Sequence, residues 1–264
     1  MQKSLIIDAH VHIYPQFDFS QAIKNSMLNF DASLSPEKKS KAIKIWLLTE
    51  RSDCHFFARA LQVDVPDFSI EKAGEEALLV FDDKHNPMLY IFAGRQLVSS
   101  DNLEVCALTT TFSQPDKKRT TLDTIKAVQD AGGLAAINWA PGKWFGERGK
   151  IVEHLFEILH PTELFISDTT MRPTIWPTPR LMAAAQKRGF RVLSGSDPLP
   201  FRGEEKLIGS YAFEISDEFN AAEPAASVRA ILNEAQNQIR VYGRRSGPLT
   251  FMRRQMKIMS EKKG

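Results

Sequence analysis

The sequence has few cysteines and no long apolar segment. Its two cysteines, Cys54 and Cys106, lie far apart and form no C-x-x-C motif. Neither a zinc knuckle nor a disulfide framework is therefore expected, and a reducing, cytoplasmic compartment is predicted. No apolar run approaches 18 residues, so we expect no membrane span. One short apolar run leads directly to Asp8, so we also expect no signal peptide.

The net charge of the chain is small, +2, and gives no reason to expect a specific nucleic-acid partner. Residues 241–264 hold seven Lys or Arg and one acidic residue, which leaves residues 1–240 at net −4. Apolar residues make up 43% of the chain and charged residues 25%, as in an ordinary globular protein with a real core. The basic character therefore belongs to the C-terminal segment.

What the chain does contain is a polar motif after its first apolar run. Residues 5–7 are apolar, and Asp8, His10 and His12 follow at alternate positions. Side chains alternate faces along a strand, so we expect these three to share one face. Two imidazoles and a carboxylate could then converge on a divalent metal. The alternative is a half-buried strand end whose histidines are satisfied by hydrogen bonds.

Strand-like and helix-like segments alternate along most of the chain, which favours an α/β fold built on a parallel sheet. A turn-rich connector at 82–87 separates two apolar runs that read as an antiparallel hairpin. A bend is expected at 94–96. The predicted strands after the first are 43–48, 77–81, 88–92, 103–108, 134–137, 164–167, 190–193 and 211–215. Seven or eight of these strands, counted with the first, would close a distorted TIM-like barrel.

We expect the barrel to span residues 1–240, with a basic amphipathic tail at 241–264 packed on it or extending from it. Leu249, Met252, Met256 and Met259 recur at helical spacing in that tail, with basic residues between them. The tail could contact a partner or an anionic surface. The interpretation we favour is a C-terminal helix that packs its methionines on the body.

In such a barrel, functional groups lie at the C-terminal ends of strands. His10 and His12 meet that condition, and His55 follows the second strand. His85 lies in the hairpin connector, His154 in a helix and His160 before a strand, so these three are poor candidates. Asp197 ends a strand in a Gly-Ser-Asp turn and is the strongest carboxylate candidate, unless it is an Asx-turn or N-cap residue. With the two histidines it would form a site that activates water.

Many cations lie in loops that would meet at the same rim. They are Arg51, Arg95, Lys143, Arg148, Arg172, Arg202 and Lys206. Together they favour a small anionic substrate such as a phosphate ester or a carboxylate. We take Arg51, Arg95, Lys143 and Arg202 as the candidate substrate-binding residues.

Asp8-Ala9-His10-Val11-His12 and the late Gly195-Ser196-Asp197 resemble motifs of the PHP (polymerase and histidinol phosphatase) family. This resemblance implies a metal-dependent phosphoesterase on a distorted (β/α)7 barrel. Other ligand positions of the family are replaced here: its Asp-His by Glu50-Arg51, its bridging Glu by Gln96, and two histidines by Ala140 and Leu199. Neutral Gln, Ala and Leu cannot ligate as Glu and His do.

The resemblance thus implies one divalent ion, zinc, manganese or iron, on His10, His12 and Asp197. Additional site residues would be Glu50, His55, Gln96 and Asp168, and Asp8 would orient an imidazole or act as a base. We predict a metal-dependent hydrolase acting on an anionic substrate, foremost a phosphoester. The alternatives are a barrel that lost catalysis and serves as an anion-binding or scaffold protein, and an amidohydrolase-type C–N hydrolase. The tryptophan-containing loop at 139–148 could be a lid or could simply pack.

Overall fold

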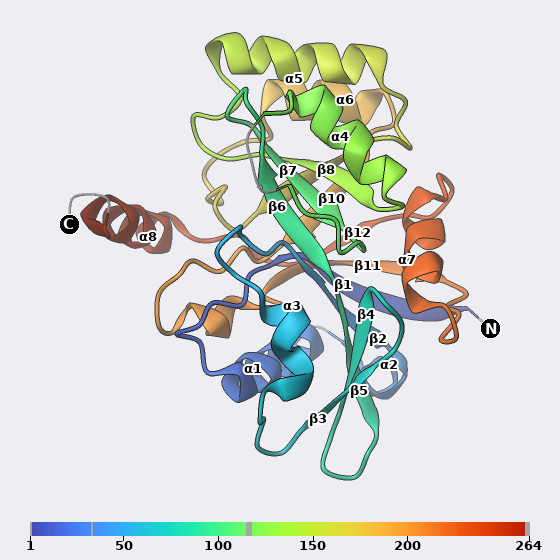
Figure 1. Ribbon diagram of the computed structural model, residues 1–264. Coiled ribbons are helices and arrows are strands. Elements are labelled where there is room, and N and C mark those ends of the chain that lie inside the picture. Colours follow the sequence, from blue (N-terminus) through green and yellow to red (C-terminus); the bar gives the residue numbers. More distant parts are fainter. Residues whose placement is uncertain (1, 33, 115–117, 262–264) are drawn as a thin grey trace.

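The computed structural model describes residues 2–32, 34–114 and 118–261, and its strands form two open sheets (Figure 1). The predicted closed barrel is therefore wrong. The seven-stranded sheet has the order β12-β11-β1-β2-β5-β4-β3, and the five-stranded sheet has the order β10-β9-β8-β7-β6. The strands are β1 (Lys3–Val11), β2 (Ile43–Leu48), β3 (Ser69–Lys72), β4 (Ala77–Phe81), β5 (Pro87–Phe92), β6 (Gly94–Val98), β7 (Glu104–Leu108), β8 (Leu134–Asn138), β9 (Phe165–Thr169), β10 (Val192–Gly195), β11 (Tyr211–Asp217) and β12 (Arg240–Gly243).

Both sheets are mixed, and this explains why the barrel does not close. β1, β2 and β5 are parallel, but β3–β5 form an antiparallel meander, and β11 and β12 run antiparallel on the other side of β1. In the second sheet β8, β9 and β10 are parallel, and β7 pairs antiparallel with both β6 and β8. Between the two sheets, the described residues form one isolated bridge, Glu50 to Arg95, instead of a ladder. Hairpins therefore replace some of the strand–helix crossovers that a closed barrel needs.

The helices are α1 (Phe19–Asp31), α2 (Pro36–Lys41), α3 (Phe56–Arg59), α4 (Thr121–Asp130), α5 (Gly146–Ile158), α6 (Arg180–Lys187), α7 (Pro224–Asn233) and α8 (Pro248–Glu261), with short 3₁₀ turns η1 (Ala60–Gln62) and η2 (Glu204–Leu207). Helices α1–α3 lie beside the seven-stranded sheet and α4–α6 beside the five-stranded sheet, whereas α8 projects from the side of the molecule (Figure 1). One apolar cluster lies between the sheets and is closed by α7. Two others lie outside the sheets, one under α1 and α3 and one under α4, α5 and α6. The site described below lies where the two sheets meet.

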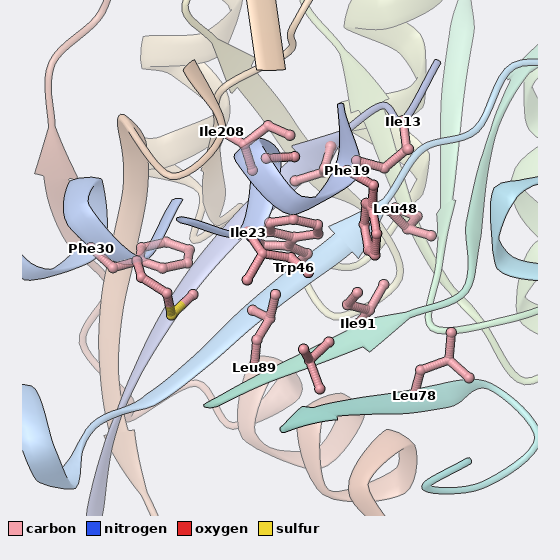
Figure 2. Close-up of a cluster of buried hydrophobic side chains, with 14 of the residues drawn as sticks. Ile13, Phe19, Ile23, Phe30, Trp46, Leu48, Leu78, Leu89, Ile91 and Ile208 are labelled. Atoms are coloured by element: carbon pink, nitrogen blue, oxygen red, sulfur yellow. The ribbon is translucent and has the colours of Figure 1, made fainter. Parts of the chain in front are cut away.

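The cluster under α1 shows how the sequence builds this arrangement (Figure 2). The Asp18 carboxylate accepts a hydrogen bond from the Gln21 amide and caps the helix. Phe19, Ile23 and Phe30 recur at helical spacing and join the same apolar cluster as Trp46 of β2 (Figure 2). The ring centres of Phe19 and Trp46 lie 6.1 Å apart. Burying these side chains contributes roughly 2 kcal/mol each. This packing holds α1 against β2, the strand that pairs with β1 beside the polar motif.

Several sequence predictions about single elements are confirmed. The hairpin forms as β4 and β5. A Ser-Pro pair also predicts a helix start at Ser35-Pro36, and there Ser35 caps α2 with Pro36 in its first turn. The expected bend at 94–96 is wrong, because Gly94 begins strand β6, where its lack of a Cβ allows close approach to the Leu48 carbonyl. Trp139 and Trp144 are buried in the cluster under α4–α6, so they pack instead of forming a lid.

The C-terminal segment differs from the favoured interpretation of it. Strand β12 crosses the predicted boundary at residue 240 and pairs with β11. In α8, Met252, Met256 and Met259 are 58–62% exposed, so the expectation that they pack on the body is wrong. Residues 262–264 of the predicted tail lie outside the described residues. None of the helices in the described part of the chain combines the length and the hydropathy needed to cross a bilayer.

Candidate metal centre

Three of the predicted site residues converge at the C-terminal end of β1. The Nε2 atoms of His10 and His12 lie 3.1 Å apart. One oxygen of Asp197, Oδ1, lies 3.7 Å from the first and 3.5 Å from the second. His10 and His12 are almost completely buried, and the Asp197 side chain is 14% exposed. Among the described residues, these three are the group whose donor atoms could hold a metal ion.

The donor set fits a divalent cation. Atoms that bind one tetrahedral zinc ion at about 2.0–2.1 Å lie roughly 3.3 Å from one another, close to the spacing here. Two imidazole nitrogens and a carboxylate suit zinc, manganese or iron and leave room for further ligands. His12 Nδ1 is buried and has no hydrogen-bond partner among the described residues. The structure therefore contains a site that could bind metal, with the identity of the metal open.

His10 is held by the neighbouring sheet. Its Nδ1 lies 3.0 Å from Ser167 Oγ on β9 and 3.7 Å from Cys106 Sγ on β7. A proton on Nδ1, shared with the serine, leaves the Nε2 lone pair free for a metal. Burial lowers the pKa of His10 to about 4, so the ring is neutral near pH 7. Burial raises the pKa of the Cys106 thiol well above its usual range, so this group stays protonated.

Asp197 is held in an unusual backbone conformation, with φ at +49°. Its amide donates to the His10 carbonyl at 2.8 Å, and Thr169 Oγ1 donates to its Oδ2 at 3.0 Å. Burial by itself would raise the pKa of its carboxyl, but the two imidazoles and the Arg254 guanidinium hold that pKa below its usual range. The carboxylate is therefore ionised and ready to bind a cation.

Asp8 does not join this group. The β1–β2 register shifts between Asp8 and Val11, so the alternation of faces is broken inside the motif. The Asp8 carboxylate is fully buried and accepts hydrogen bonds from the amides of His10, Ser196 and Gly209. Burial raises its pKa to about 6. Asp8 thus ties β1 to the two segments that flank the site.

A cavity of about 530 Å³ is bordered by two of the three residues, His12 and Asp197. It is lined by His12, Tyr14, Arg51, Gln96, Glu104, Asn138, Ala140, Pro141, Lys143, Met171, Asp197, Leu199, Pro200, Phe201, Gln255 and Ile258. Two of the predicted cations, Arg51 and Lys143, are in this lining. Arg51 pairs with the exposed Asp53, and Lys143 lies 3.3 Å from the Glu104 carboxylate. The cavity therefore combines cations with one apolar wall.

The other predicted site residues lie elsewhere. Arg95 donates to the carbonyls of Arg51 and Cys54 and contacts His55, so it supports a loop. Glu50 is buried, and this burial raises its pKa; its carboxylate accepts from the Phe57 amide. Arg202 is exposed and outside the cavity lining.

On β9, the Asp168 side chain lies on the face opposite to that of Ser167, which contacts His10. There it forms a buried pair with Arg172 and accepts from the Tyr211 hydroxyl. The structure thus separates Arg95, Glu50, Arg202 and Asp168 from the group of His10, His12 and Asp197.

Sequence reasoning missed Glu104 and Asn138. Glu104 starts β7, which runs antiparallel to β8, so it lies at the same edge as Asn138 at the end of β8. The Asn138 amide donates to the Glu104 carboxylate at 3.1 Å. A rule that searches only the C-terminal ends of strands cannot find Glu104. The turn-forming residues at 99–102, between β6 and β7, could have revealed it, because a hairpin there makes β7 antiparallel to β6 and brings the N-terminal end of β7 to this edge.

Comparisons with known proteins give a likeness in fold. No protein-family model matches the chain, and no curated protein matches it. Among solved structures, PsfC from Pseudomonas syringae PB-5123 aligns over 98% of this chain and 99% of its own, with a TM-score of 0.57 and 12% identity. In fold, this chain resembles PsfC. At that identity, the likeness to PsfC concerns the fold alone.

A second solved structure is described as a two-domain protein containing a predicted PHP-like metal-dependent phosphoesterase, from Bacteroides vulgatus ATCC 8482. It aligns over 92% of this chain and 65% of that protein, with a TM-score of 0.46 and 10% identity.

Proposed function

We propose that this protein is a metal-dependent hydrolase of a small anionic substrate, foremost a phosphoester. The observation that carries the proposal is the convergence of His10, His12 and Asp197 beside a cavity that His12 and Asp197 line. The resemblance of the Asp8–His12 and Gly195–Asp197 motifs to those of the PHP family supports the same reaction class. A divalent ion held by these residues would act as a Lewis acid and lower the pKa of water towards ~7.

The residues around the cavity have separate roles in this proposal. Arg51 and Lys143 attract the anion and offset charge that develops during the reaction. Gln96 and Asn138 supply neutral amides at the same cavity. Glu104 is the carboxylate placed to accept a proton there, since it lines the same cavity as His12 and Asp197.

The proposal is tested by removing both imidazoles in His10→Ala/His12→Ala. We expect the purified wild-type protein, prepared without chelator, to contain about one divalent ion per chain, and the double variant to contain none. Hydrolysis of phosphomonoesters should disappear with the metal. The matched control is His154→Ala/His160→Ala, which removes two histidines that are exposed at the surface.

Turnover that persists in His10→Ala/His12→Ala contradicts the proposal. No metal in the wild-type protein, even after incubation with excess zinc, manganese or iron, contradicts it as well. In that case retained binding of an anion such as inorganic phosphate would favour the anion-binding alternative.

A further inference from the structure

The C-terminal helix α8 presents one buried cation to the site. Most of its described side chains are exposed, and the methionines on its outer side are 58–62% exposed. Arg254 is the exception, with 2% exposure. A helix that docked only for stability would bury its apolar side chains, because their burial is the main source of stability. This helix instead buries a guanidinium group.

Arg254 joins three segments around the metal-binding group. One nitrogen donates to Thr170 Oγ1 at 2.7 Å, and another donates to the Asp197 carbonyl at 2.6 Å. The second nitrogen also lies 2.9 Å from the Glu204 carboxylate, which is 11% exposed. Charge-assisted hydrogen bonds with this fork geometry are strong and directional. Arg254 therefore fixes the backbone of Asp197 from the C-terminal side.

The backbone of Asp197 needs such support. A non-glycine residue at positive φ costs roughly 1 kcal/mol or more and persists only when its surroundings hold it there. The Asp197 amide is held by the His10 carbonyl of β1. Its carbonyl is held by Arg254. The two bonds together fix the direction in which the carboxylate faces the imidazoles.

The same helix also contributes a wall of the cavity. Gln255, next to Arg254, and Ile258, one turn further on, line it together with His12 and Asp197. Lys257 Nζ lies 5.2 Å from the ring centre of Phe201, another lining residue. Arg51 and Lys143 lie in the same lining, so the cavity has cations and an apolar surface. A substrate that fits it carries an anionic group and an apolar group.

We propose that α8 is an integral part of the site. Arg254 is a positioning residue that holds Asp197 in its ligand conformation, and Ile258 contacts the apolar group of the substrate. This inference rests on the proposed function. It assigns a role to a segment that the sequence set apart as a tail.

The first test is the affinity of purified Arg254→Gln for zinc or manganese, measured by isothermal titration calorimetry. Residues that orient a ligand typically change metal affinity by about 10–100-fold, and we expect a loss of that size. The matched control is Arg253→Gln, the same change one position earlier, at an exposed arginine of the same helix. We expect Arg253→Gln to bind the ion within about twofold of wild type.

Equal affinity in Arg254→Gln and wild type overturns the inference, and so do equal losses in Arg254→Gln and Arg253→Gln. If Arg254→Gln does not fold, Arg254→Lys keeps the charge but cannot hold the fork geometry, and it should still lose about tenfold in metal affinity. Failure of the proposed function is distinct, because there the wild-type protein itself binds no ion.

The role of Ile258 in the cavity wall is tested with Ile258→Ala. The control is Met256→Ala, on the same helix, where the side chain is 62% exposed. For a phosphomonoester with an aromatic group, we expect Ile258→Ala to raise KM about 3- to 10-fold with little change in kcat. The lost contact stabilises the bound substrate and the transition state equally, so its removal weakens binding without slowing the chemical step. The Met256→Ala variant should keep the wild-type KM. An unchanged KM in Ile258→Ala contradicts the proposal that Ile258 contacts the apolar group of the substrate.

Discussion

The orientation of His10 depends on a single hydroxyl group. Ser167 Oγ lies 3.0 Å from His10 Nδ1, and both groups are buried. In Ser167→Ala the ring loses the partner that selects its tautomer, and we expect metal affinity to fall about 10-fold. Metal titration of the purified variant by calorimetry checks this, with circular dichroism to confirm that the fold is intact.

A suitable control for Ser167→Ala is Ser99→Ala. Ser99 is also buried, and its hydroxyl bonds to Thr121 and to the Leu103 carbonyl, away from the site. Its variant should lose stability but keep the metal affinity of wild type. The same fall in affinity for both variants would mean that general stability, and not the orientation of His10, controls binding.

At the scale of residues, the sequence predicted that His10, His12 and Asp197 come together, but not that the Asp8 side chain lies apart from them. The identities of His10, His12 and Asp197 followed from residue type, strand alternation and a Gly-Ser-Asp turn. Asp8 was expected on the same face as the histidines. The register shift after Asp8 could not be read from the residues, because a bulge depends on the pairing of β1 with β2. Arg254 was out of reach for a similar reason, since Thr170 and Asp197, to which it donates, lie 84 and 57 positions away in the chain.

At the scale of elements, α2 is attached mainly by polar contacts. None of its residues is buried, but Lys38 Nζ donates to the Glu214 carboxylate of β11 at 2.7 Å. Ser4 of β1 donates to the same oxygen at 2.6 Å. Burial by itself would raise the pKa of Glu214, yet these hydrogen bonds hold it below the ordinary value of 4.5. The ionised carboxylate therefore stabilises the fold.

The pH dependence of the Glu214→Gln effect follows from the lowered pKa of Glu214 in the folded protein. A depressed pKa in the folded state gives stability that is present above pH 4.5 and is lost as the pH falls through the folded-state pKa. We expect Glu214→Gln to lower the free energy of unfolding by about 1 kcal/mol at pH 7, since Lys38 is half exposed and screened by solvent. Urea unfolding at pH 7 and at pH 3 measures the difference, which should shrink at the lower pH.

Glu37→Gln serves as the control for that pair. Glu37 contacts Lys41 within α2, and both side chains are more than 70% exposed. Its variant should change stability by less than about 0.5 kcal/mol at either pH. A Glu214→Gln penalty that stays constant between the two pH values would show that lost packing, not lost charge, causes it.

At the scale of the whole molecule, two glycines mark where the sheets meet. A Cβ on Gly94 of β6 would clash with the Leu48 carbonyl of β2. A Cβ on Gly195 of β10 would lie 2.5 Å from the His10 amide nitrogen of β1. The sequence predicted most of the strands and the hairpin of β4 and β5, and from the number of strands a closed barrel. It could not predict that the strands split into two sheets, because strand counts do not fix the direction or the ladder of each pair.

The contact between Gly195 and His10 links the packing of the sheets to the site, and Gly195→Ala tests it. The added methyl group has no space, and the atoms it meets include backbone, so one strand must move. We expect a loss of about 3 kcal/mol in the free energy of unfolding. Metal affinity should fall as well, since His10 moves with β1.

Gly247→Ala is the matched control for this substitution, because no atom lies within 4 Å of the added methyl group. That variant should stay within about 0.5 kcal/mol of wild type and keep its metal affinity. Urea unfolding measures the stability of both variants, and metal titration measures their affinity for the ion. If Gly195→Ala were as stable as Gly247→Ala and bound metal equally well, the two sheets would tolerate separation at this point, and the site would not depend on their close approach.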